Sequence, residues 1–260
     1  MGTLLHIDRL SVRFGGLKAV DEVSFDVEEG RFVGLIGPNG AGKTTFMDAV
    51  TGLVPSTGRI VLDGRDLNKY RSHQRVRAGV SRTFQSLELF EDLTVRENLL
   101  VAAERQHWWS LARDLVRPRP SASAAEAVDR AIMLLDLGAV ADLLPPDLPL
   151  GRRKLVTVAR ALAQSPRLLL LDEPAAGLDS GEGLEFGLRM RALVEQGVTI
   201  VMIDHDMALV LRVCDRIQVL DFGKLIASGT PEEIRTSDRV IRAYLGADDG
   251  EPAAPSRSAG

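Results

Sequence analysis

The stretch GPNGAGKTT, from Gly37 to Thr45, decides how this chain is expected to fold. It fits the pattern G-x-x-x-x-G-K-[ST], in which glycines let backbone N–H groups turn toward phosphate groups. The run RFVGLI before it is short and apolar, and the run TFMDAVTGL after it suits a helix. Lys43 would supply positive charge to the outer phosphates, and the Thr44 hydroxyl would bind Mg²⁺. The residues expected to line this loop are Gly37, Pro38, Asn39, Gly40, Ala41, Gly42, Lys43, Thr44 and Thr45.

An acidic pair follows a fully apolar segment farther along the chain. The stretch LLLLDEP, Leu168 to Pro174, predicts a buried strand with Asp172 and Glu173 at its carboxyl end. Ligands bind at that end of the strands in open parallel sheets. Asp172 would hold Mg²⁺ through water, and Glu173 would polarise the water that attacks a phosphate. Capping of the strand end is the plain alternative, and the phosphate loop upstream favours the catalytic interpretation.

His205 follows a second apolar segment, VTIVMID, at the corresponding end. A lone histidine is usually a surface or packed residue. This one ends a third expected strand of the same sheet, so it could reach the terminal phosphate. Strands that alternate with helices predict an α/β fold with a mostly parallel sheet covered by helices. The earlier stretches LLHIDRLSVRF, EVSFDVEEG and GRIVLDGRDL are three further candidate strands.

Composition limits the function classes. The chain has 260 residues, 45% of them hydrophobic and 26% charged, which is ordinary for a folded globular domain. A net charge of −4 gives no case for nucleic acid as the main partner. The single cysteine, Cys214, excludes an internal disulfide and favours a reducing compartment. No apolar stretch approaches about 18 residues, so any membrane role is expected to come through a partner.

In these motifs and their order the chain resembles the ATPase subunits of ATP-binding-cassette (ABC) transporters, from Leu4 to Gly246. The resemblance implies a RecA-like P-loop NTPase domain over residues 1–246, with an N-terminal antiparallel β subdomain. A helical subdomain would be inserted at about residues 87–164. ATP and Mg²⁺ are the implied cofactors. Residues 247–260 are polar and rich in proline, and we expect them to form a disordered tail.

The resemblance also assigns residues outside the phosphate loop. Gln85, in the stretch RTFQ, would contact the metal and the attacking water. Asp179, in the D-loop AGLD, would cross to a partner subunit. Phe14 stands where the family places an aromatic ring that stacks on adenine, with core packing as the alternative. The implied catalytic residues are Lys43, Gln85, Glu173 and His205. The implied metal-binding residues are Thr44, Gln85 and Asp172.

One motif departs from the family pattern. The family signature LSGGQ corresponds here to Leu148, Pro149, Leu150, Gly151 and Arg152. In the family, the serine hydroxyl and nearby backbone N–H groups bind the terminal phosphate of ATP held by the partner subunit. Proline offers neither group, although it is well tolerated in the first turn of a helix. We therefore expect pairing with a second, non-identical ATPase subunit, which confines the weakened site to one of two, with a homodimer left open.

Closer resemblance points to importers of branched-chain amino acids. The stretches that carry it are RTFQ (82–85), LTVRENLLVA (93–102), DEPAAGL (172–178), IDHDM (203–207) and VIRAYLG (240–246). It implies a subunit on the cytoplasmic face of the membrane that works through permease subunits. A periplasmic or extracellular binding protein would be only an indirect partner. ATPases of urea or amide importers look alike and are the nearest alternative.

Two other classes stay open at this stage. A soluble ABC ATPase of DNA repair would carry a coiled coil or zinc insert between Lys43 and Asp172, and this chain shows neither pattern. Translation-type members usually carry two cassettes, whereas this chain has one. A nucleotide sensor with little turnover is favoured by Pro149 and disfavoured by Glu173 and His205. The apolar residues after Gln85 favour an importer, because they suit docking on a membrane subunit over residues 87 to about 115; they are Leu87, Leu89, Phe90 and Leu93. Within that segment we expect Trp108 and Trp109 to pack between helices.

Overall fold

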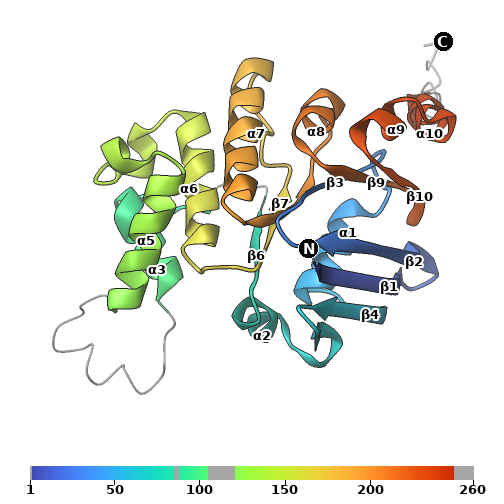
Figure 1. The fold of residues 1–260 in the computed structure, drawn as a ribbon, viewed down its shortest axis with the longest axis horizontal. Helices are drawn as coiled ribbons and strands as arrows, with labels where there is room; N and C mark the ends of the chain where they lie inside the picture. Colours follow the sequence, from blue (N-terminus) through green and yellow to red (C-terminus); the bar gives the residue numbers. More distant parts are fainter. Residues whose placement is uncertain (1, 85–87, 105–120, 249–260) are drawn as a thin grey trace, which may run out of the picture.

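The structure is a computed structural model that describes residues 2–84, 88–104 and 121–248 (Figure 1). Gln85, Leu87, Trp108, Trp109 and residues 249–260 lie outside the described residues. The described residues form two sheets and a set of helices that cover them (Figure 1). No helix within these ranges is both long and apolar enough to span a bilayer.

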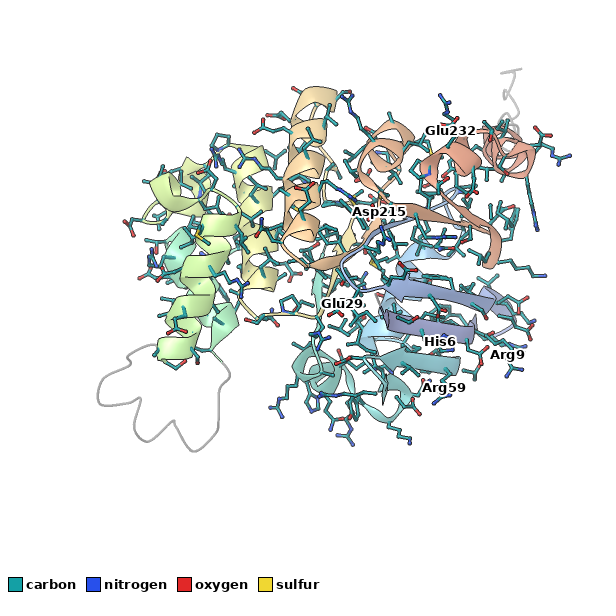
Figure 2. All side chains as sticks on the ribbon, in the orientation of Figure 1. His6, Arg9, Glu29, Arg59, Asp215 and Glu232 are labelled. Atoms are coloured by element: carbon teal, nitrogen blue, oxygen red, sulfur yellow. The ribbon has the colours of Figure 1, made fainter. Side chains whose placement is uncertain are left out.

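The first sheet is antiparallel and has the strand order β2-β1-β4-β5. Its strands are β1 (Thr3–Phe14), β2 (Leu17–Glu28), β4 (Thr57–Leu62) and β5 (Arg65–Asp66). One face is polar and faces solvent, as the side chains of His6, Arg9 and Arg59 show (Figure 2). His6 pairs there with Asp26 across β1 and β2, with 2.6 Å between Nδ1 and Oδ1. The other face is apolar, as alternation along half-buried strands requires.

The second sheet has six strands in the order β10-β9-β3-β8-β7-β6. All neighbours are parallel except β10, which forms an antiparallel hairpin with β9. These strands are β3 (Phe32–Ile36), β6 (Val80–Thr83), β7 (Leu168–Asp172), β8 (Thr199–Ile203), β9 (Arg216–Asp221) and β10 (Lys224–Gly229). Every residue of β3, β7 and β8 is buried, because both faces of the parallel sheet are covered.

Alternate residues of β7 belong to two different cores. Leu168 and Leu170 pack with the apolar face of the first sheet and with Phe46 of helix α1 (Lys43–Thr51). Leu169 and Leu171 pack on the opposite side, against the helices that cover the other face. The period of two along a strand therefore divides one apolar run between both cores.

Helices cover the second sheet and form a separate group at one end. Helices α3, α5 and α6 lie together on the left in Figure 1, beyond β6 and β7. The side chain of Arg96 in α3 pairs with that of Asp129 in α5, at 2.5 Å. The helices are α2 (Ser72–Arg77), α3 (Val95–Ala103), α5 (Ala122–Leu134), α6 (Leu150–Leu162), α7 (Ser180–Glu195), α8 (Met207–Val213), α9 (Pro231–Arg235) and α10 (Asp238–Asp248). Short 3-10 turns span Leu67–Lys69, Gly138–Val140 and Pro145–Asp147.

Three local expectations need correction. The stretch GRIVLDGRDL is not one strand but two, β4 and β5, because Asp63 and Gly64 turn the chain with φ of 50° and 74°. Pro149 is not in the first turn of α6 but at its N-cap, with φ −58° and ψ 154°. Helix α10 continues through Asp248, two residues into the tail that was expected over residues 247–260.

Gly34 gives a test of the core. A methyl group on Gly34 would lie 2.6 Å from Cγ1 of Val210 and 3.1 Å from Sγ of Cys214, both buried. Because such overpacking forces backbone shifts, we expect Gly34→Ala to lower the free energy of unfolding by about 1–3 kcal/mol in urea denaturation. Gly138→Ala is the control, because nothing lies within 4 Å of its methyl position. Equal stability of both variants would contradict this packing.

Candidate functional site

The phosphate loop lies between β3 and α1, as the sequence predicts. Its glycines are required by close contacts on its outer side. A Cβ atom on Gly37 would lie 2.1 Å from the carbonyl oxygen of Leu220, and one on Gly42 would lie 2.2 Å from that of Ala19. Gly42 also has a φ of 96°, which only glycine adopts readily. The loop is therefore held against the β9–β10 hairpin on one side and against β2 on the other.

Lys43 is the first residue of α1 and is only 8% exposed. Its Nζ donates hydrogen bonds to the carbonyl oxygens of Gly37 at 2.6 Å and Pro38 at 2.9 Å. Burial lowers the pKa of Lys43, and the negative charges of Glu173 and Asp172 oppose that change. The ammonium group thus lies inside the loop, with two carboxylates near enough to act on it. The next residue, Thr44, is exposed at the loop.

The acidic pair and the histidine lie at one edge of the parallel sheet. Asp172 ends β7 and pairs in register with Ile203, the last residue of β8. The backbone N–H of Glu173 donates to the carbonyl oxygen of Ile203 at 2.9 Å. On the other side of β8, Leu35 of β3 pairs with the same Ile203, just before the phosphate loop. The expectation that loop, Asp172, Glu173 and His205 share one edge is thereby met.

Glu173 has a left-handed backbone, with φ of 46°. This conformation costs a non-glycine residue free energy and tends to occur at functional sites. His205 is exposed, and its Nδ1 lies 3.7 Å from Oδ1 of Asp204. Asp204 itself is only 2% exposed, and burial raises the pKa of its carboxyl group. Asp204 also accepts a hydrogen bond from the backbone N–H of Asp206 at 3.0 Å, which fixes the turn that carries His205.

Several residues near the site were not predicted from the sequence. Lys154 of α6 is 7% exposed; burial lowers its pKa, and Asp204 opposes that change. It lines a small pocket together with Glu173. Tyr244 of α10 forms a hydrogen bond with the backbone of Gly37, and burial raises its pKa to about 12. Tyr244 lies in the stretch VIRAYLG, but that pattern does not indicate a contact with the phosphate loop, so only the tertiary structure places both residues near the site.

The expected adenine-stacking residue lies at the tip of a hairpin. Phe14 ends β1 and is 50% exposed, so the alternative that it packs in the core is wrong. Leu17, across the same tip, and Phe222, at the tip of the β9–β10 hairpin, are also exposed. The two hairpins meet at Gly42, whose Cβ position is near both Ala19 and Gly223. Adenine stacking on Phe14 stays a prediction.

The signature residues contact the D-loop of the same chain. A Cδ2 atom of Leu150 lies 3.5 Å from the Cβ position of Gly177, and one of Leu178 lies 3.9 Å from that of Gly151. Leu148 is buried, and Pro149 makes no side-chain cap hydrogen bond. Arg152 donates to the carbonyl oxygen of Asp136 at 2.7 Å. Within the described residues, these contacts join the signature to the helical group and the D-loop, and not to the phosphate loop.

Asp179 ends the D-loop and is the N-cap residue of α7. Its Oδ1 accepts hydrogen bonds from the backbone N–H groups of Gly181 and Glu182, both at 2.8 Å. The side chain of Glu182 completes a capping box with the backbone of Asp179. Asp179 therefore has a structural role at the helix start, and its expected contact with a partner subunit stays a prediction.

A family profile described as "ABC transporter" matches residues 20–176, which is more than half of the chain. The chain belongs to the ABC transporter family. The fold class predicted from the sequence is confirmed, since solved ABC cassettes share this fold. A second profile, described as "Branched-chain amino acid ATP-binding cassette transporter", matches residues 224–250 of this ABC chain.

Curated relatives match the ABC chain over nearly its whole length. The high-affinity branched-chain amino acid transport ATP-binding protein LivG of Salmonella typhimurium is 43% identical, over 94% of this chain and 98% of LivG. BraF of Pseudomonas aeruginosa, with the same description, is 41% identical over equal shares. The lipopolysaccharide export system ATP-binding protein LptB of Escherichia coli is 35% identical, also over 94% of this chain and 98% of LptB.

Two solved structures of an ABC transporter cassette show the same fold. The ADP conformation of one superposes with a TM-score of 0.83 at 28% identity, covering 95% of this chain and all of that one. A nucleotide-free cassette superposes with a TM-score of 0.81 at 29% identity. The superposition covers 94% of this chain and 99% of that cassette.

The loop of this ABC ATPase suits ATP, the nucleotide of its family. Lys43 already donates to two carbonyl oxygens of the loop, so the place that anionic oxygens would take is lined by a cation. Glycine-rich loops of this pattern also offer backbone N–H groups to phosphate oxygens. The hydroxyl of Thr44 and the carboxylate of Asp172 are oxygen ligands of the kind that Mg²⁺ prefers. Both groups therefore fit the residues that are present.

Lys43→Ala tests this site. The substitution removes a buried positive charge from the loop, so we expect ATP affinity to fall about 100-fold, in line with loss of charge-assisted hydrogen bonds. Isothermal titration calorimetry measures the affinity. Lys69→Ala is the control, because its side chain is 78% exposed on another element. ATP binding by Lys43→Ala at wild-type affinity would contradict the assignment.

Proposed function

We propose that this chain is the ATP-hydrolysing subunit of an importer for branched-chain amino acids. It would work with Mg²⁺ on the cytoplasmic face of the membrane, through permease subunits. The observation that supports hydrolysis is the alignment of the phosphate loop, Asp172, Glu173 and His205 at one sheet edge. The substrate rests on the similarity to LivG and BraF and on the match of residues 224–250.

The proposed mechanism divides the work among residues of this chain. Lys43 and the backbone N–H groups of the loop hold the outer phosphates, while Thr44 and Asp172 hold Mg²⁺, which when bound spreads the charge of the phosphates. Glu173 polarises the attacking water from its strained position at the end of β7. His205 contacts the terminal phosphate, and its turn is fixed by Asp204. Gln85 would add contacts to metal and water.

The permease would dock on the helical group beside β6. Phe90 is exposed there, with the guanidinium of Arg160 5.3 Å from its ring centroid. Arg160 of α6 also donates to the carbonyl oxygen of Glu88, and Oδ1 of Asn98 in α3 accepts a hydrogen bond from the backbone N–H of Phe90 at 2.9 Å. Two helices therefore hold the segment that carries this ring. Leu89 packs against the core below it. Phe90 is thus presented rigidly, which suits a contact that transmits motion to a membrane subunit.

We also propose that the second ATPase subunit is a different chain. Pro149 ends the preceding loop with neither N–H nor hydroxyl to offer, and Leu150 occupies space beside Gly177. A homodimer would carry this defect at both ATP sites, whereas a heterodimer confines it to one. The extracellular binding protein would contact the permease and not this chain. A urea or amide importer is the alternative substrate class.

Glu173→Gln separates binding from hydrolysis. The amide keeps the shape of the side chain but cannot act as a base, so we expect the hydrolysis rate of the assembled transporter to fall about 100-fold or more. ATP affinity should be retained. Uptake of radiolabelled leucine by cells should be lost with hydrolysis, and uptake of urea serves to test the alternative substrate.

The matched control is Glu185→Gln, because Glu185 is an exposed partner of Arg189 on α7. It should leave hydrolysis and uptake unchanged. Wild-type hydrolysis by Glu173→Gln would reject Glu173 as the base. Leucine uptake that does not depend on this chain would reject the proposed transport function.

Pro149→Ser combined with Leu150→Gly tests the asymmetry. The change restores a hydroxyl, an N–H group and close approach at the start of α6. We expect ATP-dependent homodimers of the variant to form at about 10–100-fold lower ATP concentration, because one charge-assisted hydrogen bond is regained. Light scattering measures dimer formation, alone and with the partner subunit. No gain in either setting would mean that the native signature is already competent.

A further inference from the structure

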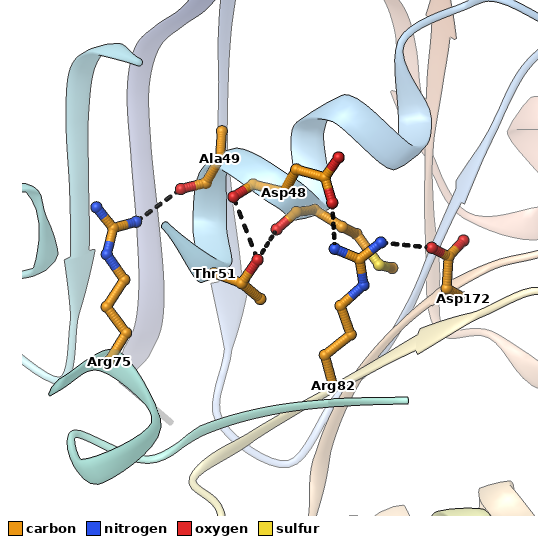
Figure 3. A network of polar contacts seen from close by, with 7 residues as sticks. Asp48, Ala49, Thr51, Arg75, Arg82 and Asp172 are labelled. Atoms are coloured by element: carbon orange, nitrogen blue, oxygen red, sulfur yellow. Dashed lines mark hydrogen bonds and ion pairs between the residues drawn. The ribbon is translucent and has the colours of Figure 1, made fainter. Parts of the chain in front are cut away.

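Arg82, in β6, has a side chain that is only 5% exposed and lies between two carboxylates. Its Nη1 is 2.5 Å from Oδ1 of Asp48 in α1, and its Nη2 is 2.6 Å from Oδ2 of Asp172 in β7 (Figure 3). The guanidinium also lies 5.1 Å from the ring centroid of Phe84. It thus joins the helix that follows the phosphate loop to the carboxylate expected to hold Mg²⁺.

Sheet geometry places this arginine where it is. In the parallel pair of β6 and β7, Arg82 is in register with Leu170. Asp172 lies two residues beyond Leu170, so its side chain emerges on the same face of the sheet. That is the face covered by α1, because Leu170 packs with Phe46 and Met47. Strand register therefore brings Arg82, Asp172 and α1 together, although Arg82 and Asp172 belong to separate sequence motifs.

The charges make the contact necessary. The side chain of Asp172 is 8% exposed, and a buried carboxylate without a cation partner is costly. The side chain of Asp48 is 27% exposed. Its negative charge would repel that of Asp172 if Arg82 did not lie between the two carboxylates. A guanidinium presents several N–H groups in a rigid fork, so it can serve both carboxylates at once, which a lysine ammonium on its flexible stem does less well.

We propose that Arg82 is a positioning residue for Mg²⁺-dependent nucleotide binding. It holds Asp172 through Oδ2, so the carboxylate is already oriented before the metal arrives. It also fixes that carboxylate relative to α1, the helix that begins with Lys43. This inference rests on the proposed binding of Mg²⁺ through Thr44 and Asp172.

Arg82 could also have the opposite effect on metal binding, which is to weaken it. An arginine on Asp172 could compete with Mg²⁺ for the same carboxylate, and its removal would then make metal binding easier. Positioning and competition therefore predict opposite signs when Arg82 is replaced by a neutral side chain. The sign of the change decides between them.

The experiment measures binding of a fluorescent ATP analogue to the full chain by anisotropy, as Mg²⁺ is titrated from an EDTA-treated sample. In Arg82→Met, we expect the Mg²⁺ concentration for half-maximal enhancement to rise about 10–100-fold, as for other residues that orient metal ligands. An unchanged or lowered Mg²⁺ requirement would overturn the proposal. The melting temperature is measured in parallel, because loss of a buried ion pair also destabilises the fold.

Arg75→Met is the matched control. Arg75 is also buried and also holds α1, but through the carbonyl oxygen of Ala49 at 2.6 Å (Figure 3). It donates as well to the carbonyl oxygen of Val50 at 2.9 Å. It makes no contact with Asp172 among the described residues. We expect Arg75→Met to lower the melting temperature and to leave the Mg²⁺ requirement unchanged. An equal rise in both variants would mean that loosening of α1 is the cause, which would also overturn the proposal.

Arg82→Lys keeps a cation at the site. If Arg82→Met does not fold, the Mg²⁺ requirement is measured in Arg82→Lys instead. Its single ammonium cannot hold both carboxylates as the guanidinium does, so we expect a Mg²⁺ requirement between those of the wild type and the metal-ligand variant Asp172→Asn. A wild-type requirement in Arg82→Lys would count against the proposal. Wild-type chain that binds the analogue equally well with and without Mg²⁺ would instead reject the proposed metal site itself.

Discussion

The register of three parallel strands is the constraint on which this site depends. Ile203, the last residue of β8, pairs with Leu35 on one side and with Asp172 on the other. Hydrogen bonds between β3 and β8 and between β8 and β7 therefore bring the phosphate loop, the acidic pair and His205 to the same edge of the sheet. A slip of one residue would turn Asp172 to the opposite face of the sheet, away from α1. The complete burial of β3, β7 and β8 protects the register, because each slip would expose or misplace apolar side chains.

Segments far apart in the chain hold the phosphate loop from outside. Ala19 comes from the first sheet, Leu220 and Gly223 from the β9–β10 hairpin, and Tyr244 from the last helix. Most of these contacts are made to backbone atoms, so they fix the course of the loop backbone directly. The stability of the loop is thus a property of the whole domain. The residues expected to bind phosphate lie within the loop itself, whereas the conformation of the loop depends on distant segments.

The sequence predicted correctly those features that depend on a motif of consecutive residues. The phosphate loop, the strand that ends in Asp172 and the strand before His205 each carry their own pattern, and the structure places all three as predicted. It could not find the Arg82 contacts, because these need β6 to lie beside β7, and strand order is not encoded locally. Tyr244 was missed for the same reason. The split of one expected strand could have been predicted, because Asp63-Gly64 is an Asp-Gly pair, which strongly favours a tight turn with positive φ at both residues.

The left-handed backbone of Glu173 has a consequence for protein engineering. A glycine at this position would avoid the cost of about 1–2 kcal/mol that a left-handed backbone imposes on other residues. It would also delete the carboxylate at the end of β7. If Glu173 is the base proposed above, a gain in folding stability at this position would come at the expense of turnover, so a design that optimises stability alone should leave this residue fixed.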